Sequence, residues 1–249
     1  MSRDWDAATY DRVSEPQVEW AAEVLGRLPL RGDETVLDAG CGSGRVTQLL
    51  LERLPRGHVV AVDSAPSMVE HAREALDPER ATVFRADLTE LSLDEPVDAA
   101  FSNAVFHWVP DHDALFARLH AALRPGGRLV AQCGGEGNVE RFHDAAKAVG
   151  AEQPYGDYLA GWQGPWNFAG ADATAERLER AGFTEIETWL EPYPVTPPDP
   201  TGFLRTVCLG HHLDQLPEEL RAPYVEAVRE RCGTELDYVR LNIQAKTAC

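Results

Sequence analysis

Features of secreted and membrane proteins are scarce in this sequence. No stretch approaches the roughly 18 apolar residues that a membrane-spanning helix needs. The polar, acidic start at residues 1–11 is unlike a signal peptide. The cysteines lack C-x-x-C spacing and are odd in number, which favours free thiols over disulfides or structural zinc: Cys41, Cys133, Cys208, Cys232 and Cys249. We therefore expect a cytoplasmic protein.

Positive charge is also in short supply. Lys and Arg number 23 against 41 Asp and Glu, so the net charge is −18. Because such a surface repels phosphate backbones and anionic lipids, we expect no nucleic acid and no membrane as partner. With 249 residues, 44% of them hydrophobic, the chain suits a single globular domain. Its oligomeric state stays open between monomer and dimer.

Two common catalytic motifs are missing. No G-x-S-x-G occurs, so a serine nucleophile of that type is not expected. No H-E-x-x-H or other recognised metal spacing connects the possible ligands in the second half. These are Glu136, His143, Asp144, His211 and His212. We expect no metal.

The first half alternates strand-like and helix-like segments, which predicts βαβ units and a parallel sheet covered on both faces. The expected strands are residues 34–39, 58–62, 82–85, 97–102 and 128–133. The expected helices are residues 18–28, 45–53, 66–76 and 111–123. A cofactor-binding core is therefore expected at about residues 30–133.

The second half is less regular. It predicts a helix at 174–181, a strand at 183–190, a helix at 216–231 bent or restarted at Pro223, and a last strand at 236–245. Five prolines between residues 192 and 200 predict an extended linker. We expect two insertions, about 134–173 and 191–235, to form a substrate cap above the sheet.

A glycine-rich loop after the first strand is the strongest signal. It follows the pattern D-x-G-x-G-x-G from Asp38 through Gly40 and Gly42, and it leads into a helix N-terminus, which favours anions. The dinucleotide spacing G-x-G-x-x-G fails, because its last position falls on Arg45 or Thr47. An acid such as Asp38 can pair an ammonium, which NAD lacks. A nicotinamide oxidoreductase is thus disfavoured.

Two further carboxylates follow the next strands. Asp63 ends the second strand, where an acid can accept hydrogen bonds from ribose hydroxyls. Asp87 follows the third strand and can accept from an adenine amino group. Since open α/β sheets bind ligands at the carboxyl ends of their strands, these acids and the glycine loop belong to one expected site.

Together with these residues, the segments VLDAGCGSG, VVAVDSAPSMVEHA, RADL, SNAVFHWVPDH and LRPGGRLVAQ make the chain similar to class I S-adenosylmethionine-dependent methyltransferases. Within them it resembles most the trans-aconitate methyltransferase group, over about residues 4–133 and more loosely over 236–247. The resemblance implies a Rossmann-like, seven-stranded, mostly parallel sheet with a final antiparallel strand, and S-adenosyl-L-methionine as cofactor. It implies these cofactor contacts: Asp38, Gly40 and Gly42 to the methionine moiety, Asp63 to ribose, Ser64 and Met68 to adenosine, Asp87 and Leu88 to adenine, and Asn103 at the end of strand four.

The predicted function is methyl transfer to a small molecule, with an oxygen nucleophile such as a carboxylate or hydroxyl preferred. Alternatives are N- or C-methylation, or a cofactor-binding protein of the same fold that has lost methyl transfer or catalyses another reaction. The trans-aconitate group often has Gln where His107 stands here, so the acceptor can differ. His107 is interpreted as a general base or as a wall residue.

Aromatic residues can form a desolvated box around a sulfonium through cation–π attraction, or belong to ordinary packing. They are Trp5, Tyr10, Phe106, Trp108, Trp162 and Trp166. Trp5 and Tyr10 suggest that about residues 1–20 fold over the cofactor as a lid. For a carboxylate acceptor, Arg141 and Arg205 are the candidates, unless they are solvated surface charges.

Overall fold

The computed structural model describes residues 15–249 and contains one seven-stranded sheet with the order β3-β2-β1-β4-β5-β7-β6. Five strands run parallel: β1 (Thr35–Ala39), β2 (His58–Asp63), β3 (Ala81–Arg85), β4 (Val97–Asn103) and β5 (Leu123–Gly134). The last strand, β7 (Leu236–Thr247), is antiparallel to both β5 and β6 (Phe183–Val195). The predicted mostly parallel sheet with a final antiparallel strand is confirmed.

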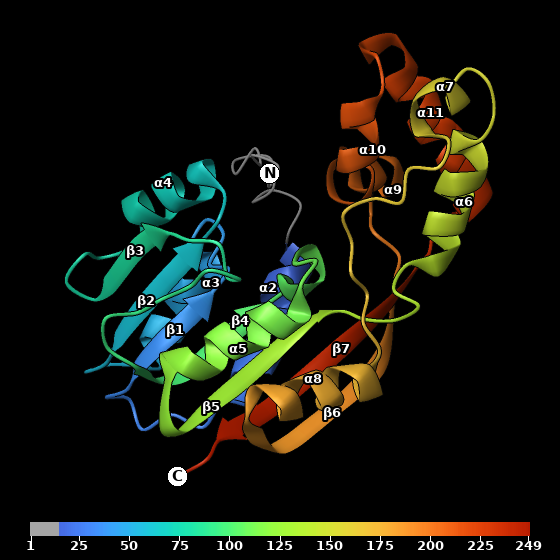
Figure 1. Ribbon diagram of the computed structural model, residues 1–249. Coiled ribbons are helices and arrows are strands. Elements are labelled where there is room, and N and C mark those ends of the chain that lie inside the picture. The colour runs from blue at the N-terminus through green and yellow to red at the C-terminus, as the bar shows by residue number, and fades with distance from the viewer. Residues whose placement is uncertain (1–14) are drawn as a thin grey trace.

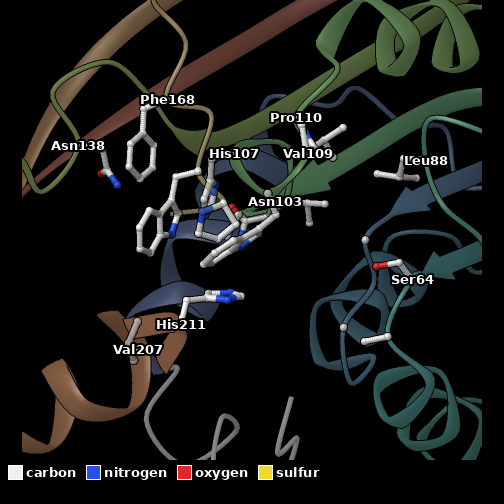
Figure 2. A pocket seen from close by; sticks show the side chains of 18 of the residues that line it. Ser64, Leu88, Asn103, His107, Val109, Pro110, Asn138, Phe168, Val207 and His211 are labelled. Carbon is white, nitrogen blue, oxygen red and sulfur yellow. The ribbon is translucent and has the colours of Figure 1, made fainter. Parts of the chain in front are cut away.

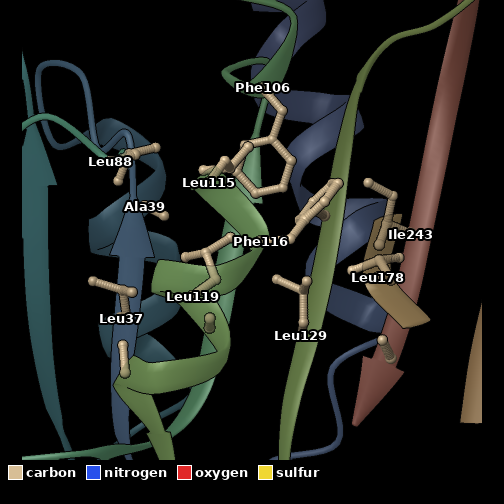
Figure 3. Close-up of a cluster of buried hydrophobic side chains, with 14 of the residues drawn as sticks. Leu37, Ala39, Leu88, Phe106, Leu115, Phe116, Leu119, Leu129, Leu178 and Ile243 are labelled. Carbon is tan, nitrogen blue, oxygen red and sulfur yellow. The ribbon is translucent and has the colours of Figure 1, made fainter. Parts of the chain in front are cut away.

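Helices cover both faces of this sheet (Figure 1). One face carries α5 (His112–Ala122) and α8 (Ala171–Ala181). The other carries α2 (Glu15–Gly26), α3 (Arg45–Glu52) and α4 (Pro66–Ala75). Leu37 and Leu129 from the sheet pack with Phe116 and Leu119 from α5 in the first core (Figure 3). The apolar strands are thereby buried on two sides, as short runs of Val, Leu and Ala require.

A cap of short helices stands over one end of the sheet (Figure 1). The chain after β5 supplies α6 (Glu140–Gly150) and α7 (Gly156–Leu159). The chain after β6 supplies α9 (Pro200–Phe203), a turn of π-helix η2 (Leu204–Cys208), α10 (Gly210–Gln215) and α11 (Glu218–Cys232). The cap has its own core, in which the buried Tyr224 donates a hydrogen bond of 2.9 Å to the Ala146 carbonyl. Two stretches far apart in sequence are joined there.

The proline-rich segment departs from the sequence prediction. Strand β6 continues to Val195, so the predicted linker begins only after it. Pro192 lies opposite Val239, and Pro194 lies opposite Asp237. Both prolines are tolerated because β6 is an edge strand, and a residue whose N–H would face away from β7 makes no hydrogen bond within the sheet. Pro223 does not divide α11, which runs as one helix. Of the helices in residues 15–249, none combines the length and apolar character needed to cross a membrane.

Candidate functional site

A cavity of about 650 Å³ lies where the carboxyl ends of the parallel strands meet the cap. Figure 2 shows Ser64 and Leu88 at one end, Asn138 and Phe168 at the other, and His107 with Asn103 between them. The volume is in the range of small-molecule sites. We call the end near Ser64 the cofactor half and the end near Phe168 the acceptor half.

The glycine loop shapes the cofactor half. The N–H groups of Gly40 and Cys41 donate to the Val62 carbonyl at 2.8 and 2.9 Å, which ties the loop to β2. Gly40 has a φ of +89°, and a Cβ added there would lie 2.2 Å from Val105 Cγ2. Only glycine fits this close approach. Gly42 also has a positive φ, but no atom lies within 4 Å of an added Cβ.

Two carboxylates face the same half. Asp63 accepts hydrogen bonds from the N–H groups of Gly42, at 3.0 Å, and Ala65, at 2.9 Å. Burial raises the pKa of Asp63 above its ordinary value. Asp87 accepts from the N–H and hydroxyl of Thr89 at 2.9 and 2.7 Å. Both carboxylates line the cavity with most of the other predicted cofactor residues, namely Gly40, Gly42, Ser64, Met68, Leu88 and Asn103.

Asp38 lies behind the glycine loop and is not on the cavity wall. Its Oδ2 accepts a hydrogen bond of 2.7 Å from the Thr47 hydroxyl in the first turn of α3. Burial raises its pKa to about 7, against the effect of the Thr47 hydrogen bond. A contact of Asp38 with a bound ammonium, direct or through water, stays a prediction, and its position behind the loop favours an indirect one.

His107 lines the centre of the cavity from the 3₁₀ turn η1 (Phe106–Trp108). The Gly134 N–H donates to its Nδ1 at 3.2 Å, so this nitrogen must be the unprotonated one. Burial, with smaller contributions from the charges of Arg240 and His112, lowers its pKa to about 3. The imidazole is thus neutral with the proton on Nε2, where it donates a hydrogen bond and cannot accept a proton. Of the two roles considered, this geometry favours the wall residue.

The acceptor half is strongly aromatic. Trp108 and Trp166 both line it, with ring centroids 6.2 Å apart. The ring of His143 lies 4.7 Å from Trp166, and burial lowers the pKa of His143 to about 4. Neutral imidazoles and indoles therefore surround this half.

Several predicted acceptor residues are elsewhere. Phe106 is fully buried in the first core, where its ring centroid lies 5.9 Å from that of Phe116 on α5. Trp162 lines a second cavity of about 480 Å³ behind Trp166. Arg141 is half-exposed and paired with Glu235, at 3.0 Å, and with Asp237, at 3.5 Å. These three residues, like the exposed Arg205, do not line the cavity.

Arg240 is a cavity residue that the sequence prediction missed. It comes from the middle of β7, and only 3% of it is exposed. Its Nε donates to Gln132 Oε1 at 3.2 Å, and its guanidinium carbon lies 4.9 Å from the centre of the Trp20 ring. β7 mixes polar and apolar residues, so no local pattern distinguished this buried arginine.

Trp5, Tyr10 and most of the expected lid at residues 1–20 lie outside the described residues, and residues 15–20 begin α2. The structure therefore leaves the lid as a prediction. Across residues 15–249, no group of three His, Cys, Asp or Glu side chains is arranged to hold a metal ion.

Comparison with known proteins gives one family match and many relatives. Residues 36–127 match the model of a methyltransferase domain. The chain is 35% identical over 188 residues to a trans-aconitate 2-methyltransferase of Methylobacterium nodulans, covering 75% of this chain and 67% of the relative. It is 32% identical over 240 residues to the enzyme of that name from Methylobacterium radiotolerans, covering 90% and 87%.

Solved structures agree on the fold. An S-adenosylmethionine-dependent methyltransferase from Mesorhizobium loti has a TM-score of 0.55 and 25% identity, covering 92% of this chain and 97% of the other. Phosphoethanolamine N-methyltransferase 2 of Haemonchus contortus, in complex with S-adenosyl-L-methionine, has a TM-score of 0.65 and 19% identity over 98% and 57%. Both matches extend over more than nine-tenths of this chain, so they include the cap as well as the sheet.

Proposed function

Since this chain belongs to the class I S-adenosylmethionine-dependent methyltransferases, near the trans-aconitate methyltransferase group, we propose that it methylates a carboxylate of a small organic acid. The cofactor is S-adenosyl-L-methionine, and the residues of the cofactor half suit it. Asp63 and Asp87 offer carboxylate oxygens for hydroxyl and amino groups. Gly40 keeps the wall free of side-chain atoms where Val105 closes in.

The single observation that carries this proposal is the hydrogen bond from the Gly134 N–H to Nδ1 of the buried His107, which leaves this imidazole an N–H as the group it can offer an acceptor. Alcohols, phenols and ammonium groups must lose a proton during methylation, and a base needs a pKa near the working pH. His107 has its Nδ1 occupied by the Gly134 N–H and its pKa lowered to about 3. The pKa of His143 is lowered to about 4, and burial raises that of the Cys208 thiol to about 12. These three groups are poor bases, and a carboxylate needs none.

The transfer itself is balanced without a proton. When bound in the cofactor half, S-adenosyl-L-methionine would supply the methyl group: a bond from the carboxylate oxygen to the methyl carbon would form as the carbon–sulfur bond broke, and the electron pair would stay on sulfur in S-adenosylhomocysteine. His107 donates from Nε2 and orients the acceptor oxygen. Trp108 and Trp166 exclude water, and aromatic faces favour a cation such as a sulfonium.

The relatives and the charge of the chain support a small acid as the acceptor. The relatives are named for trans-aconitate, a small carboxylic acid. The net charge of −18 disfavours a nucleic-acid acceptor. Five free cysteines support a reducing compartment, and we propose the cytoplasm.

The test is a turnover assay with S-adenosyl-L-methionine and matched acceptors: trans-aconitate, catechol and ethanolamine. We expect a product 14 mass units heavier only from the acid, and alkali should return the acid by hydrolysing the ester. Preferred methylation of catechol or ethanolamine would contradict the proposal. An alkali-stable product from the acid would indicate C-methylation and contradict it as well. The Gly40→Ala variant, with its cofactor half blocked, is the negative control.

A further inference from the structure

We infer that Arg240 holds a second carboxylate of the acceptor, separate from the one that is methylated, and so selects acids with more than one carboxylate. This inference rests on the proposed function. It concerns a residue of β7, in the stretch 236–247 where the resemblance to the family is looser.

The position of Arg240 is fixed from several sides. Its Nε donates to Gln132 Oε1 at 3.2 Å, and Gln132 Nε2 in turn donates to Asn242 Oδ1 at 2.7 Å. The Trp20 ring lies 4.9 Å from the guanidinium carbon. Because the guanidinium is already held in one orientation, it loses little conformational entropy when it binds a ligand. Its two parallel N–H groups can donate to both oxygens of a carboxylate.

The charges around the cavity favour an anion next to Arg240. Among the described lining residues, Arg240 is the only Lys or Arg. The acidic lining residues are Asp63 and Asp87 in the cofactor half, together with Asp111. Asp111 is already used to cap α5, where it accepts from the Ala114 N–H at 2.9 Å. Among the side chains of the described lining residues, Arg240 therefore offers an acceptor carboxylate its permanent positive charge.

The reacting carboxylate is the wrong partner for this arginine. That carboxylate loses its negative charge as it becomes an ester, so a buried cation beside it stabilises the starting anion more than the transition state. Two charge-assisted hydrogen bonds would also occupy the oxygen lone pairs that attack the methyl group. The neutral Nε2–H of His107 suits the reacting oxygen better. A carboxylate that keeps its charge throughout gains binding from Arg240 at no cost in rate.

The experiment compares two acids built on one double bond. trans-Glutaconate has two carboxylates, and crotonate has one. We expect the wild-type protein to use trans-glutaconate at least about 10-fold more efficiently, by kcat/KM, because a hydrogen-bonded charge pair contributes about that much or more. Arg240→Gln should raise the KM for trans-glutaconate about 10- to 100-fold and leave kcat nearly unchanged. Crotonate turnover should stay the same.

Two binding measurements separate other roles of Arg240. The calorimetric affinity of Arg240→Gln for S-adenosylhomocysteine should equal that of the wild-type protein. Its affinity for trans-glutaconate, measured on the S-adenosylhomocysteine complex, should fall by the same factor by which the KM rises. Arg240→Lys keeps the positive charge but lacks the two parallel N–H donors of a guanidinium. Its KM for trans-glutaconate should lie between the values of wild type and Arg240→Gln. Arg141→Gln removes a paired arginine outside the cavity and is the matched control.

The outcomes are distinct. Equal losses on both acids would mean that Arg240 binds the reacting carboxylate, and weaker S-adenosylhomocysteine binding would assign it to the cofactor; either result overturns the inference. Equal use of both acids by the wild-type protein also overturns it, while the proposed function stands. If S-adenosylhomocysteine binds but neither these acids nor trans-aconitate yield an ester, the proposed function fails and this inference falls with it.

Discussion

Asp38 gives the most quantitative prediction, because it is a buried acid whose pKa is raised from 3.8 to about 7. The unfolded chain releases this proton near pH 3.8, whereas the folded protein keeps it up to about pH 7. Between these values the folded state binds more protons, so stability falls as the pH rises. The difference between the pKa values of the unfolded and folded states corresponds to about 4 kcal/mol over the whole window.

The perturbation is Asp38→Asn, which keeps the size of the side chain and an oxygen to accept the Thr47 hydrogen bond. It removes only the charge. About 2–3 kcal/mol of the loss falls between pH 5 and pH 8. We therefore expect the stability advantage of the cofactor-free variant over wild type to grow by that amount from pH 5 to pH 8.

The assay is urea unfolding of both cofactor-free proteins at the two pH values, followed by calorimetric titration with S-adenosylhomocysteine at pH 8. The variant should bind more weakly there, because it lacks the negative charge behind the loop that attracts the ligand's ammonium. Comparing the two proteins at each pH cancels the contributions of the buried histidines. An advantage that is the same at pH 5 and pH 8 would refute the pKa and its cause.

Two further predictions concern the loop and the centre of the cavity. Gly40→Ala should cost about 2–5 kcal/mol in stability, because the new Cβ would have a positive φ and a 2.2 Å contact with Val105. It should also abolish S-adenosylhomocysteine binding in a thermal-shift assay. Gly42→Ala makes no such contact and should lose less stability, so equal losses in the two variants would contradict the steric argument. His107→Gln, which keeps an N–H donor, should retain most activity, whereas His107→Ala should lower kcat about 10-fold or less. A pKa between 6 and 8 in the pH–rate profile that persists in Asp38→Asn and disappears in His107→Gln would instead show that His107 is a base.

The sequence predicted the sheet, and the gathering of the glycine loop, Asp63 and Asp87 on one cavity, because their signals are local. Strand β2 was expected at 58–62 and spans His58–Asp63, and the glycine loop follows β1 directly. Asp63 and Asp87 each stand at the end of their own strand, and parallel strands bring such ends together. The backbone contacts of Asp63 with Gly42 and Ala65, and the position of Asp38 behind the loop, required the structure.

The acceptor half was predicted less well because its residues come from segments far apart in the chain. Arg141 and Arg205 were chosen for their place in the insertions, yet Arg141 is paired with Glu235 and Asp237 outside the cavity. Trp162 and Trp166 are four residues apart, and only Trp166 reaches the main cavity. No local pattern distinguishes these cases.

The sequence by itself determined the fold class, the glycine loop and the carboxylates that follow the strands. Hydrophobic periodicity, glycine spacing and the ends of strands can each be recognised within a few consecutive residues. Only the tertiary structure decided the chemistry of the acceptor half. The pairing of Gly134 with Arg240 across β5 and β7 puts a guanidinium beside the cavity, and the Gly134 N–H fixes the tautomer of His107. The first depends on the register between β5 and β7, whose paired residues lie about a hundred positions apart, and the second on a contact between η1 and the end of β5 that spans 27 positions. Neither is a local pattern in the sequence, and burial and hydrogen bonding leave Arg240 a fixed, buried cation and His107 a neutral hydrogen-bond donor.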